Sequence, residues 1–105
     1  MTLTVIIPAH DEEAVIGACL TSLVHQDIAT DVQVVVVANG CRDATAAVAQ
    51  GFGPALRRRG FSVDFCEIVE PSKPTALNIA DSLSRHGDRV YLDADVDLSS
   101  NALSS

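Results

Sequence analysis

Four short apolar runs, separated by segments of helical character, constrain the fold of this chain more than any other feature of its sequence. The runs are rich in β-branched residues and are largely apolar on both faces, which is typical of strands buried in a parallel sheet. The third run keeps a partial alternation, with Phe61, Val63 and Phe65 on one side. The four predicted strands are Leu3–Pro8, Val32–Ala38, Phe61–Val69 and Arg89–Leu92.

The segment after the first strand has the periodicity of an amphipathic helix. Its apolar residues recur at i, i+3, i+4, i+7 and i+8, which predicts a helix from about residue 12 to 26. Glu12 and Glu13 would then lie in its first turn, where carboxylates suit the helix dipole. A second helix is expected over residues 44–49, with Asp43 as its cap.

A third helix is predicted between the last two strands. Glycine and proline at residues 51–54 interrupt the second helix, and a short basic turn follows it. Ser72 or Lys73 then begins the third helix, with Pro74 in its first turn. The predicted core stripe of this helix is Leu77, Ala80 and Leu83.

This order of elements predicts an α/β fold, a Rossmann-like three-layer sandwich with a mostly parallel sheet, in one domain over residues 1–105. Ligands of such sheets bind at the carboxyl ends of the strands, where the strand order reverses. If the order is 3-2-1-4, that point lies between the first and fourth strands. Two polar segments would meet there, Ala9–Glu12 and Asp93–Asp95.

Charge and composition exclude several classes of protein. Lys and Arg total 7 against 14 Asp and Glu, a formal net charge of −7, which argues against a partner nucleic acid held by phosphate contacts. The longest apolar run, Val34–Ala38, is far too short to span a membrane, and the N-terminus lacks the basic region of a signal peptide. Three widely spaced cysteines without a CxxC motif indicate a reducing compartment, so we expect a cytoplasmic location.

Asp93-Ala94-Asp95, at the end of an apolar strand, is the strongest candidate site. Carboxylates are preferred ligands of hard divalent cations such as Mg²⁺ or Mn²⁺. Such a cation would neutralise a diphosphate, which this acidic chain otherwise repels. The alternative is a solvated acidic loop of three aspartates, since acids are common at strand ends.

The other polar positions each have an ordinary structural explanation beside the functional one. Glu12 fits either a helix terminus or the edge of a nucleotide site. Asn39 fits either a turn with Gly40 or contact with a base edge, because its amide both donates and accepts. Lys73, the single lysine, fits either a phosphate contact or a solvated charge. We expect structural roles or solvent exposure for Arg57, Arg58, Arg59, His10, His25 and His86, and no nucleophilic role for Cys41.

Four segments in order resemble the N-terminal half of family 2 glycosyltransferases with the GT-A fold. They cover nearly the whole chain, and any one of them alone would be weak. They are VIIPAHDEE at residues 5–13, VVVVANGCRD at 34–43, SKPTALN at 72–78 and YLDAD at 91–95.

The resemblance implies metal-dependent transfer of a sugar from a nucleotide-diphosphate sugar to an unknown acceptor, with Mg²⁺ or Mn²⁺ as cofactor. It also implies roles for particular residues. Pro8, Ala9 and Glu12 would line the nucleoside, Asn39 would contact the base, Lys73 would lie near the nucleotide, Asp93 and Asp95 would form the DxD pair, and Asp43 would cap a helix. Asp95 is the preferred metal ligand of that pair.

The chain departs from the family pattern at several positions. The family often has Asp at the positions of Ala38 or Asn39, Ser at that of Cys41 and Asn at that of Asp11. The acceptor-binding half and catalytic base lie beyond the DxD motif in the family, so we expect the domain to be incomplete and no catalytic residue is assigned. An inverting transfer needs a carboxylate that deprotonates the acceptor.

The sequence leaves three alternatives open. A GT-A-like remnant or interaction module would keep the fold without activity. A haloacid-dehalogenase-type phosphatase also places a DxD after an apolar strand, but there the motif opens the domain. A receiver-type domain needs an Asp at the end of the third strand, where Val69-Glu70-Pro71 has none. An open sheet edge would also permit a homo-oligomer, and membrane helices elsewhere in a longer protein would place it at the inner face of the membrane.

Overall fold

A computed structural model describes residues 2–28, 31–85, 88–98 and 102–103 of the chain, and its centre is a four-stranded parallel sheet. The strand order is β3-β2-β1-β4, which confirms the expected α/β topology with its reversal between β1 and β4. The strands are β1 (Thr2–Ala9), β2 (Asp31–Asn39), β3 (Ser62–Ile68) and β4 (Arg89–Tyr91). The helices are α1 (Ile16–Val24), α2 (Thr45–Gly51), α3 (Gly53–Arg58) and α4 (Lys73–Leu83).

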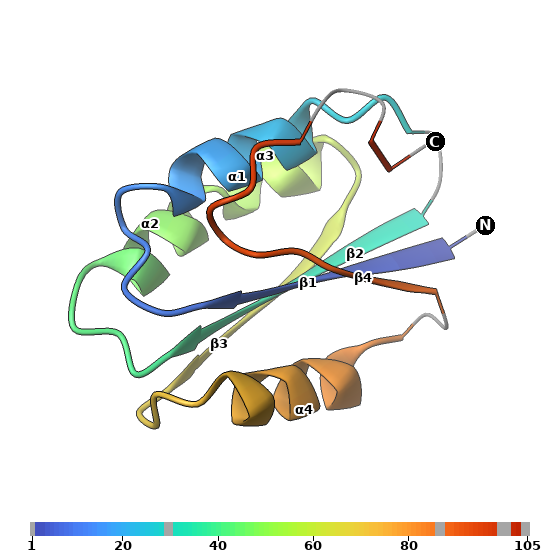
Figure 1. The fold of residues 1–105 in the computed structure, drawn as a ribbon. Helices are drawn as coiled ribbons and strands as arrows, with labels where there is room; N and C mark the ends of the chain where they lie inside the picture. Colours follow the sequence, from blue (N-terminus) through green and yellow to red (C-terminus); the bar gives the residue numbers. More distant parts are fainter. Residues whose placement is uncertain (1, 29–30, 86–87, 99–101, 104–105) are drawn as a thin grey trace.

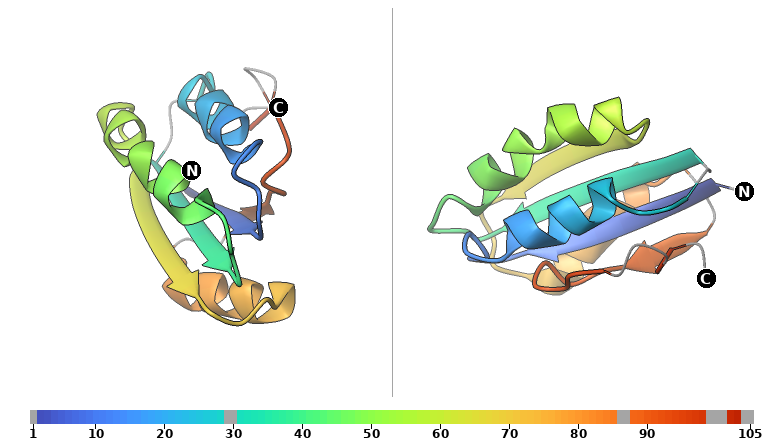
Figure 2. Two further views of the ribbon diagram at one scale, coloured as in Figure 1. Left: turned by 90° about the vertical axis from the view of Figure 1, so that its left-hand side faces the viewer. Right: turned by 90° about the horizontal axis from the view of Figure 1, so that it is seen from above.

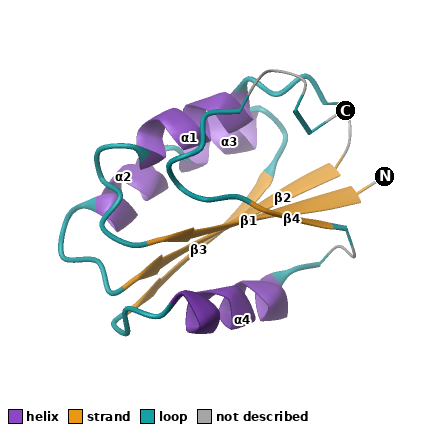
Figure 3. Ribbon diagram, viewed as in Figure 1, coloured by secondary structure: helices purple, strands orange, loops and turns teal. Residues whose placement is uncertain are grey.

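Helices cover both faces of the sheet, so the molecule has three layers (Figures 1 and 3). The first three helices lie on one face and α4 lies alone on the other, and two further views show the same arrangement (Figure 2). Each face has its own core. Alternate residues of β1 divide between them, because successive side chains of a strand point to opposite faces: Val5, Ile7 and Ala9 pack toward α1, and Ile6 packs toward α4.

Pro8 lies where β1 and β4 separate. The rungs between these strands run from Thr4 N–H to the Asp88 carbonyl and from Leu92 N–H to the Ile6 carbonyl, at 2.9 and 2.8 Å. In a parallel strand every second residue points its backbone groups to the same neighbour, so position 8 faces β4 as positions 4 and 6 do. Because proline has no N–H, it cannot donate the next rung, and the two strands diverge there. The divergence opens a crevice at the switch point.

The first helix begins later than its periodicity predicts. It starts at Ile16 and has no acidic residue in its first turn. The expectation that Glu12 and Glu13 open this helix is therefore wrong. Their backbone N–H groups instead donate to Thr45 and Asp43 of the loop before α2, which holds residues 12 and 13 outside the helix.

Two further expectations need correction. Leu83 is not a core residue of α4, because its side chain is 38% exposed, while the small residues Ala76 and Ala80 are fully buried against the sheet. Arg59 is not part of a solvated face. Its guanidinium donates to the carbonyls of Gln26 and Ile28 at 2.6 and 2.8 Å and lies over the Phe61 ring, so it fixes the chain after α1. Within the described residues, no helix has both the length and the hydropathy needed to cross a membrane.

Candidate functional site

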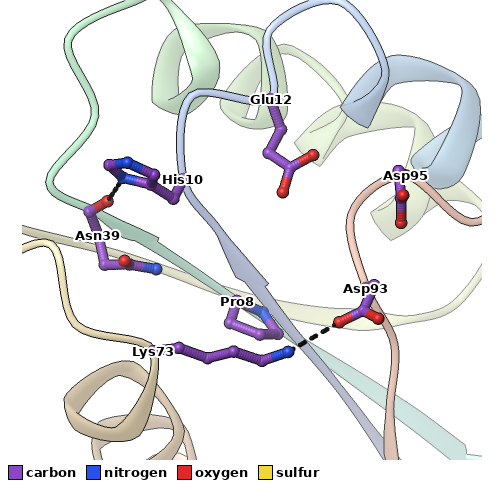
Figure 4. Close-up of a pocket in the computed structure, with 7 residues that line it drawn as sticks. All are labelled: Pro8, His10, Glu12, Asn39, Lys73, Asp93 and Asp95. Atoms are coloured by element: carbon purple, nitrogen blue, oxygen red, sulfur yellow. Dashed lines mark hydrogen bonds and ion pairs between the residues drawn. The ribbon is translucent and has the colours of Figure 1, made fainter.

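A pocket of about 240 Å³ lies in the crevice between β1 and β4, at the carboxyl ends of the strands (Figure 4). The segments that form it come from four places in the chain: the ends of β1 and β2, the start of α4 and the turn after β4. Its lining residues are Pro8, His10, Glu12, Asn39, Lys73, Asp93 and Asp95. Six of the seven residues that we expect at a nucleotide site therefore meet in one pocket, although the segments that carry them are distant in sequence.

The turn that follows β4 presents Asp93 and Asp95 to the same pocket. The strand does not continue through these residues. Val96 N–H donates to the Asp93 carbonyl at 3.0 Å and closes a turn. Ala94, between the two acids, is fully buried and anchors the turn in the core. The thiol of Cys19 on α1 also donates to the Asp93 carbonyl, at 3.9 Å. The backbone is thus held from below while both carboxylates remain exposed.

Lys73 forms an ion pair with Asp93 across the pocket. Its Nζ lies 3.0 Å from Asp93 Oδ1, and the two side chains are 60% and 66% exposed. Lys73 is the first residue of α4, and Ser72 caps that helix by accepting the N–H of Thr75 at 3.2 Å. The capped terminus therefore fixes the base of the lysine, while its side chain stays accessible to solvent and its ammonium group contacts Asp93.

Glu12 experiences the negative potential of this pocket. Its partial burial raises its pKa, and the charges of Asp95 and Asp93 raise it further. Hydrogen bonding and charge from His10 oppose that shift. Three carboxylates thus face one another around a single lysine, which leaves the pocket with an excess of negative charge.

Asn39 provides a buried amide at the inner wall. Its side chain donates from Nδ2 to the Ala9 carbonyl at 3.0 Å, and it is only 4% exposed. Because the atom facing a carbonyl must be the donor, the amide orientation is fixed and Oδ1 is left as an acceptor. His10 Nδ1 lies 2.7 Å from the Asn39 carbonyl, which places the imidazole beside this wall.

The structure differs from the predicted site at two positions. Ala9 is 1% exposed and packs into the core toward α1, so it contributes its carbonyl to Asn39 and does not line the pocket. His10 is exposed, which agrees with the expectation, but it also lines the pocket. Strand alternation explains Ala9, because its side chain points to the opposite face of β1 from that of Pro8. His10 follows the last residue of β1.

Side chains of the two loops that follow β1 and β2 bind each other's backbone. Asp11 accepts the N–H of Arg42 at 2.7 Å, and Glu13 accepts that of Ala44 at 3.0 Å. Asp43 accepts from Glu13 N–H and from both the N–H and hydroxyl of Thr45. It therefore contacts the first residue of α2, although the N-cap of this helix is Ala44 and not Asp43 as expected. Those hydrogen bonds lower the pKa of Asp43. The loop acids other than Glu12 are thus structural.

The residues of the pocket fit a hard divalent cation. Their carboxylate oxygens are the donors that Mg²⁺ and Mn²⁺ prefer, and mutual repulsion between Glu12, Asp95 and Asp93 would be relieved by a positive ion. Among the described residues, the three potential ligands that converge within 4.8 Å are Asp11, Cys41 and Asp43, outside this pocket. A cation at Asp93 and Asp95 would therefore complete its shell with water or with oxygens of a bound ligand.

The remaining candidates lie outside the pocket. Cys41 is half-buried and directs its thiol to the Ala9 and Asn39 carbonyls, which are not bases, as expected for a residue without a nucleophilic role. Arg57 and Arg58 are exposed on α3. His25 borders a separate cavity of about 370 Å³ beside α1. His86 lies outside the described residues.

Comparison with curated proteins identifies glycosyltransferase relatives. The 4,4'-diaponeurosporenoate glycosyltransferase of Staphylococcus aureus (strain bovine RF122 / ET3-1) is 44% identical over 55 residues. That match covers 52% of this chain but only 14% of the relative, so the chain corresponds to a small part of that protein.

Two solved structures have the same fold over most of this chain. Residues 1–349 of S. aureus TarS, in complex with UDP, align with 99% of this chain and 30% of that one, with a TM-score of 0.85 and 24% identity. The mannosyltransferase PcManGT from Pyrobaculum calidifontis, in complex with GDP-Man and Mn²⁺, aligns with 89% of this chain and 27% of that one. Its TM-score is 0.80 and its identity is 28%. The sheet is therefore a GT-A sheet.

The strand order is the one expected for the fold of the family that the sequence resembles, and the solved structures share that fold. The model of glycosyl transferase family 2 matches residues 4–105, which is nearly the whole chain. This protein therefore belongs to glycosyl transferase family 2.

Proposed function

We propose that the pocket binds the nucleotide diphosphate part of a sugar donor together with Mg²⁺ or Mn²⁺, and that the protein serves sugar transfer from that donor. The observation that carries the proposal is the turn that presents Asp93 and Asp95 opposite Lys73, at the point where the strand order reverses. The complex of PcManGT with GDP-Man and Mn²⁺ supports this assignment, since that chain is 28% identical and shares the fold.

Asp95 and Asp93 are the proposed holders of the cation, with Asp95 as the principal ligand. When bound, the cation would neutralise the diphosphate and stabilise the negative charge that develops on the leaving nucleotide. Side chains of the protein supply the remaining contacts. Lys73 would attract the same diphosphate, which the carboxylates alone would repel.

The inner wall is the proposed contact for the nucleoside. Pro8 offers an apolar surface, and Asn39 Oδ1 offers an acceptor that is left over after its amide N–H is used by Ala9. An N–H on the edge of a base would satisfy this buried acceptor. Uracil and guanine both carry such an N–H, so the proposal includes UDP-linked and GDP-linked donors.

The proposal concerns donor binding and leaves the catalytic base unassigned. The chain spans 14% of the curated relative and about 30% of the solved TarS chain, so the acceptor and the reaction of the whole protein are not specified by these residues. The family match gives no support to the phosphatase alternative. A GT-A domain without activity, acting as an interaction module, is the competing proposal.

Calorimetric titration tests donor binding directly. The chain is titrated with UDP and with GDP, each with and without Mn²⁺, and the same titrations are repeated on Asp95→Asn. We expect one nucleotide to bind in a metal-dependent way and Asp95→Asn to lose that binding by at least about tenfold, because a carboxylate ligand of the cation becomes a neutral amide.

A matched variant separates loss of the site from a general loss of negative charge. Asp27→Asn makes the same change at an exposed residue before β2, at the opposite end of the sheet, and should bind the nucleotide as the wild-type chain does. If the folded chain binds neither nucleotide with Mn²⁺, or if both variants behave alike, donor binding at this turn is wrong and the interaction module is favoured.

A further inference from the structure

Lys73 has a position in this pocket that the proposed donor site alone does not explain. It carries the only permanent positive charge among the described lining residues, opposite the carboxylates of Glu12, Asp93 and Asp95. Its Nζ does not point away into solvent but rests 3.0 Å from Asp93 Oδ1 (Figure 4). The lysine therefore occupies one of the carboxylates that we assign to a cation.

We propose that Lys73 is an exchangeable counter-ion of Asp93: it neutralises this carboxylate while no divalent cation is bound, and moves to the donor's diphosphate when one binds. This inference rests on the proposed function, because it requires that a cation and a diphosphate use the same pocket. It adds a consequence that donor binding alone does not have, which is that Lys73 opposes the cation and favours the nucleotide.

The two positive groups compete for one oxygen. An ammonium group at 3.0 Å from Asp93 Oδ1 occupies the position from which a cation would approach that atom. A divalent ion at the carboxylate would also repel a lysine held within a few ångströms of it. A cation that binds to the free chain must therefore first displace Lys73 from Asp93.

The ion pair has the properties that such an exchange requires. Both side chains are more than half exposed, and an exposed pair of this kind contributes little to stability. Ser72 caps α4 and fixes the backbone of Lys73, whereas the four-carbon side chain leaves the ammonium free to swing. The displaced ammonium remains at the mouth of the pocket, where a diphosphate would lie against it.

The exchange predicts opposite effects of one substitution on two ligands. Without nucleotide, Lys73→Met should bind Mn²⁺ more tightly than the wild-type chain, by up to about fivefold, the usual ceiling for an exposed ion pair. With saturating Mn²⁺, the same variant should bind the nucleoside diphosphate more weakly by about three- to tenfold, since a charged contact with phosphate is lost. Nucleotide should also raise the affinity for Mn²⁺ by a larger factor in the wild-type chain than in Lys73→Met.

The experiment measures Mn²⁺ alone first, by the electron paramagnetic resonance signal of the free ion, and then UDP and GDP by calorimetry with Mn²⁺ present. The proteins are the wild-type chain, Lys73→Met, Lys73→Arg, Arg58→Met and Asp95→Asn, each checked for folding by circular dichroism. Lys73→Arg keeps the positive charge and adds a forked donor, so it should hold Asp93 at least as firmly and bind Mn²⁺ no more tightly than wild type. Arg58→Met removes one positive charge from the opposite face of the sheet and should leave both affinities unchanged.

The outcomes separate failure of this inference from failure of the donor site. If Mn²⁺ binds, depends on Asp95, and binds Lys73→Met no more tightly than wild type, the counter-ion role is wrong while the donor site stands. If the wild-type chain shows no binding that depends on Asp95, either of Mn²⁺ alone or of a nucleotide with Mn²⁺ present, the proposed function is wrong and the inference falls with it. The exchange is supported if Lys73→Met, and none of the other variants, binds Mn²⁺ more tightly and the nucleotide more weakly than the wild-type chain does.

Discussion

The hydroxyl oxygen of Thr45 accepts the backbone N–H of Glu12 at 2.8 Å, although the two residues are 33 positions apart in the chain. Thr45 is fully buried at the start of α2, and its hydroxyl hydrogen is directed to Asp43. One side chain thus connects the loop that carries Glu12 to the helix behind it. The position of Glu12 in the pocket depends on this connection.

Replacing Thr45 by valine should destabilise the protein by about 1–3 kcal/mol. Valine keeps the shape of the side chain but leaves the Glu12 N–H without its acceptor and removes one of the two hydrogen bonds that Asp43 Oδ1 accepts from Thr45. An unpaired polar group is costly. Denaturant unfolding followed by circular dichroism measures the change. Thr21→Val is the matched control, because the Thr21 hydroxyl donates to the Gly17 carbonyl of its own helix and the residue is exposed. Equal losses in the two variants would contradict a special role for Thr45.

Gly40→Ala should be among the most destabilising small substitutions in this chain. Gly40 has φ +57°, and a Cβ there would overlap Pro71 Cβ and come within 2.5 Å of Pro71 Cα. The left-handed conformation and the clash with a rigid ring together should cost about 2–4 kcal/mol. Gly51→Ala is the control, because a Cβ at Gly51 meets nothing within 4 Å at the end of α2. It should be neutral or stabilise by up to about 1 kcal/mol.

Glu12 should make the stability of the protein depend on pH. Its pKa is raised in the folded state, mainly by burial and then by Asp95 and Asp93, so the folded protein retains a proton that the unfolded chain releases near pH 4.5. Stability from this group is therefore present below pH 4.5 and is lost as the pH rises through the folded-state pKa.

Unfolding of Glu12→Gln over a pH series, without divalent metal, checks this sign. The variant should be more stable than wild type above that window, and the difference should disappear below pH 4.5. Glu70→Gln, at an exposed residue of the loop before α4, is the matched control for the loss of one acidic side chain. A constant difference at every pH would show that the effect of Glu12→Gln is not electrostatic.

Cys19 should be unreactive in the folded protein. Its side chain is fully buried, and burial, followed by the charges of Asp95, Asp97 and Glu12, raises the pKa of its thiol to about 12. A disulfide exchange reagent should modify the half-buried Cys41 and Cys66 in the native state and reach Cys19 only at the rate of unfolding. Rapid modification of all three thiols would contradict the packing beneath the Asp93 turn.

The same thiol should reduce stability at high pH. The folded protein holds the Cys19 proton up to pH about 12, whereas the unfolded chain releases it near pH 9.0, so stability should fall as the pH rises above 9. Cys19→Ala should lose this alkaline slope, although it will be less stable overall because it leaves a small cavity.

Local sequence pattern is sufficient to predict the strands, their order and most of the pocket. The β-branched runs mark all four strands, and the rule that parallel strands share one carboxyl edge is enough to bring Glu12, Asn39, Lys73 and Asp93 together. These features depend on residues that are close in sequence or on the topology of α/β sheets in general.

Prediction from sequence fails where hydrogen bonds to residues distant in the chain determine the local structure. The predicted start of α1 is wrong because the N–H groups of Glu12 and Glu13 bond to residues about 30 positions later. The prediction for Arg59 fails for the same reason, since its partners lie before β2. The prediction for Ala9 fails for a local reason, because alternation from Pro8 along the strand is enough to assign its side chain to the core.

Leu92 N–H makes the last rung between β4 and β1, and Asp93 is the very next residue. If the two strands paired further, the pocket between them would close. Pro8 has no N–H to donate the next hydrogen bond, so the pocket stays open. An amino acid with an N–H at position 8 could extend the ladder and draw the aspartate turn into regular strand. The crevice would then close along the new rungs, and the acids would lose the turn that presents them. A covalent property of one side-chain ring, and not any attraction among the polar groups, keeps this place open.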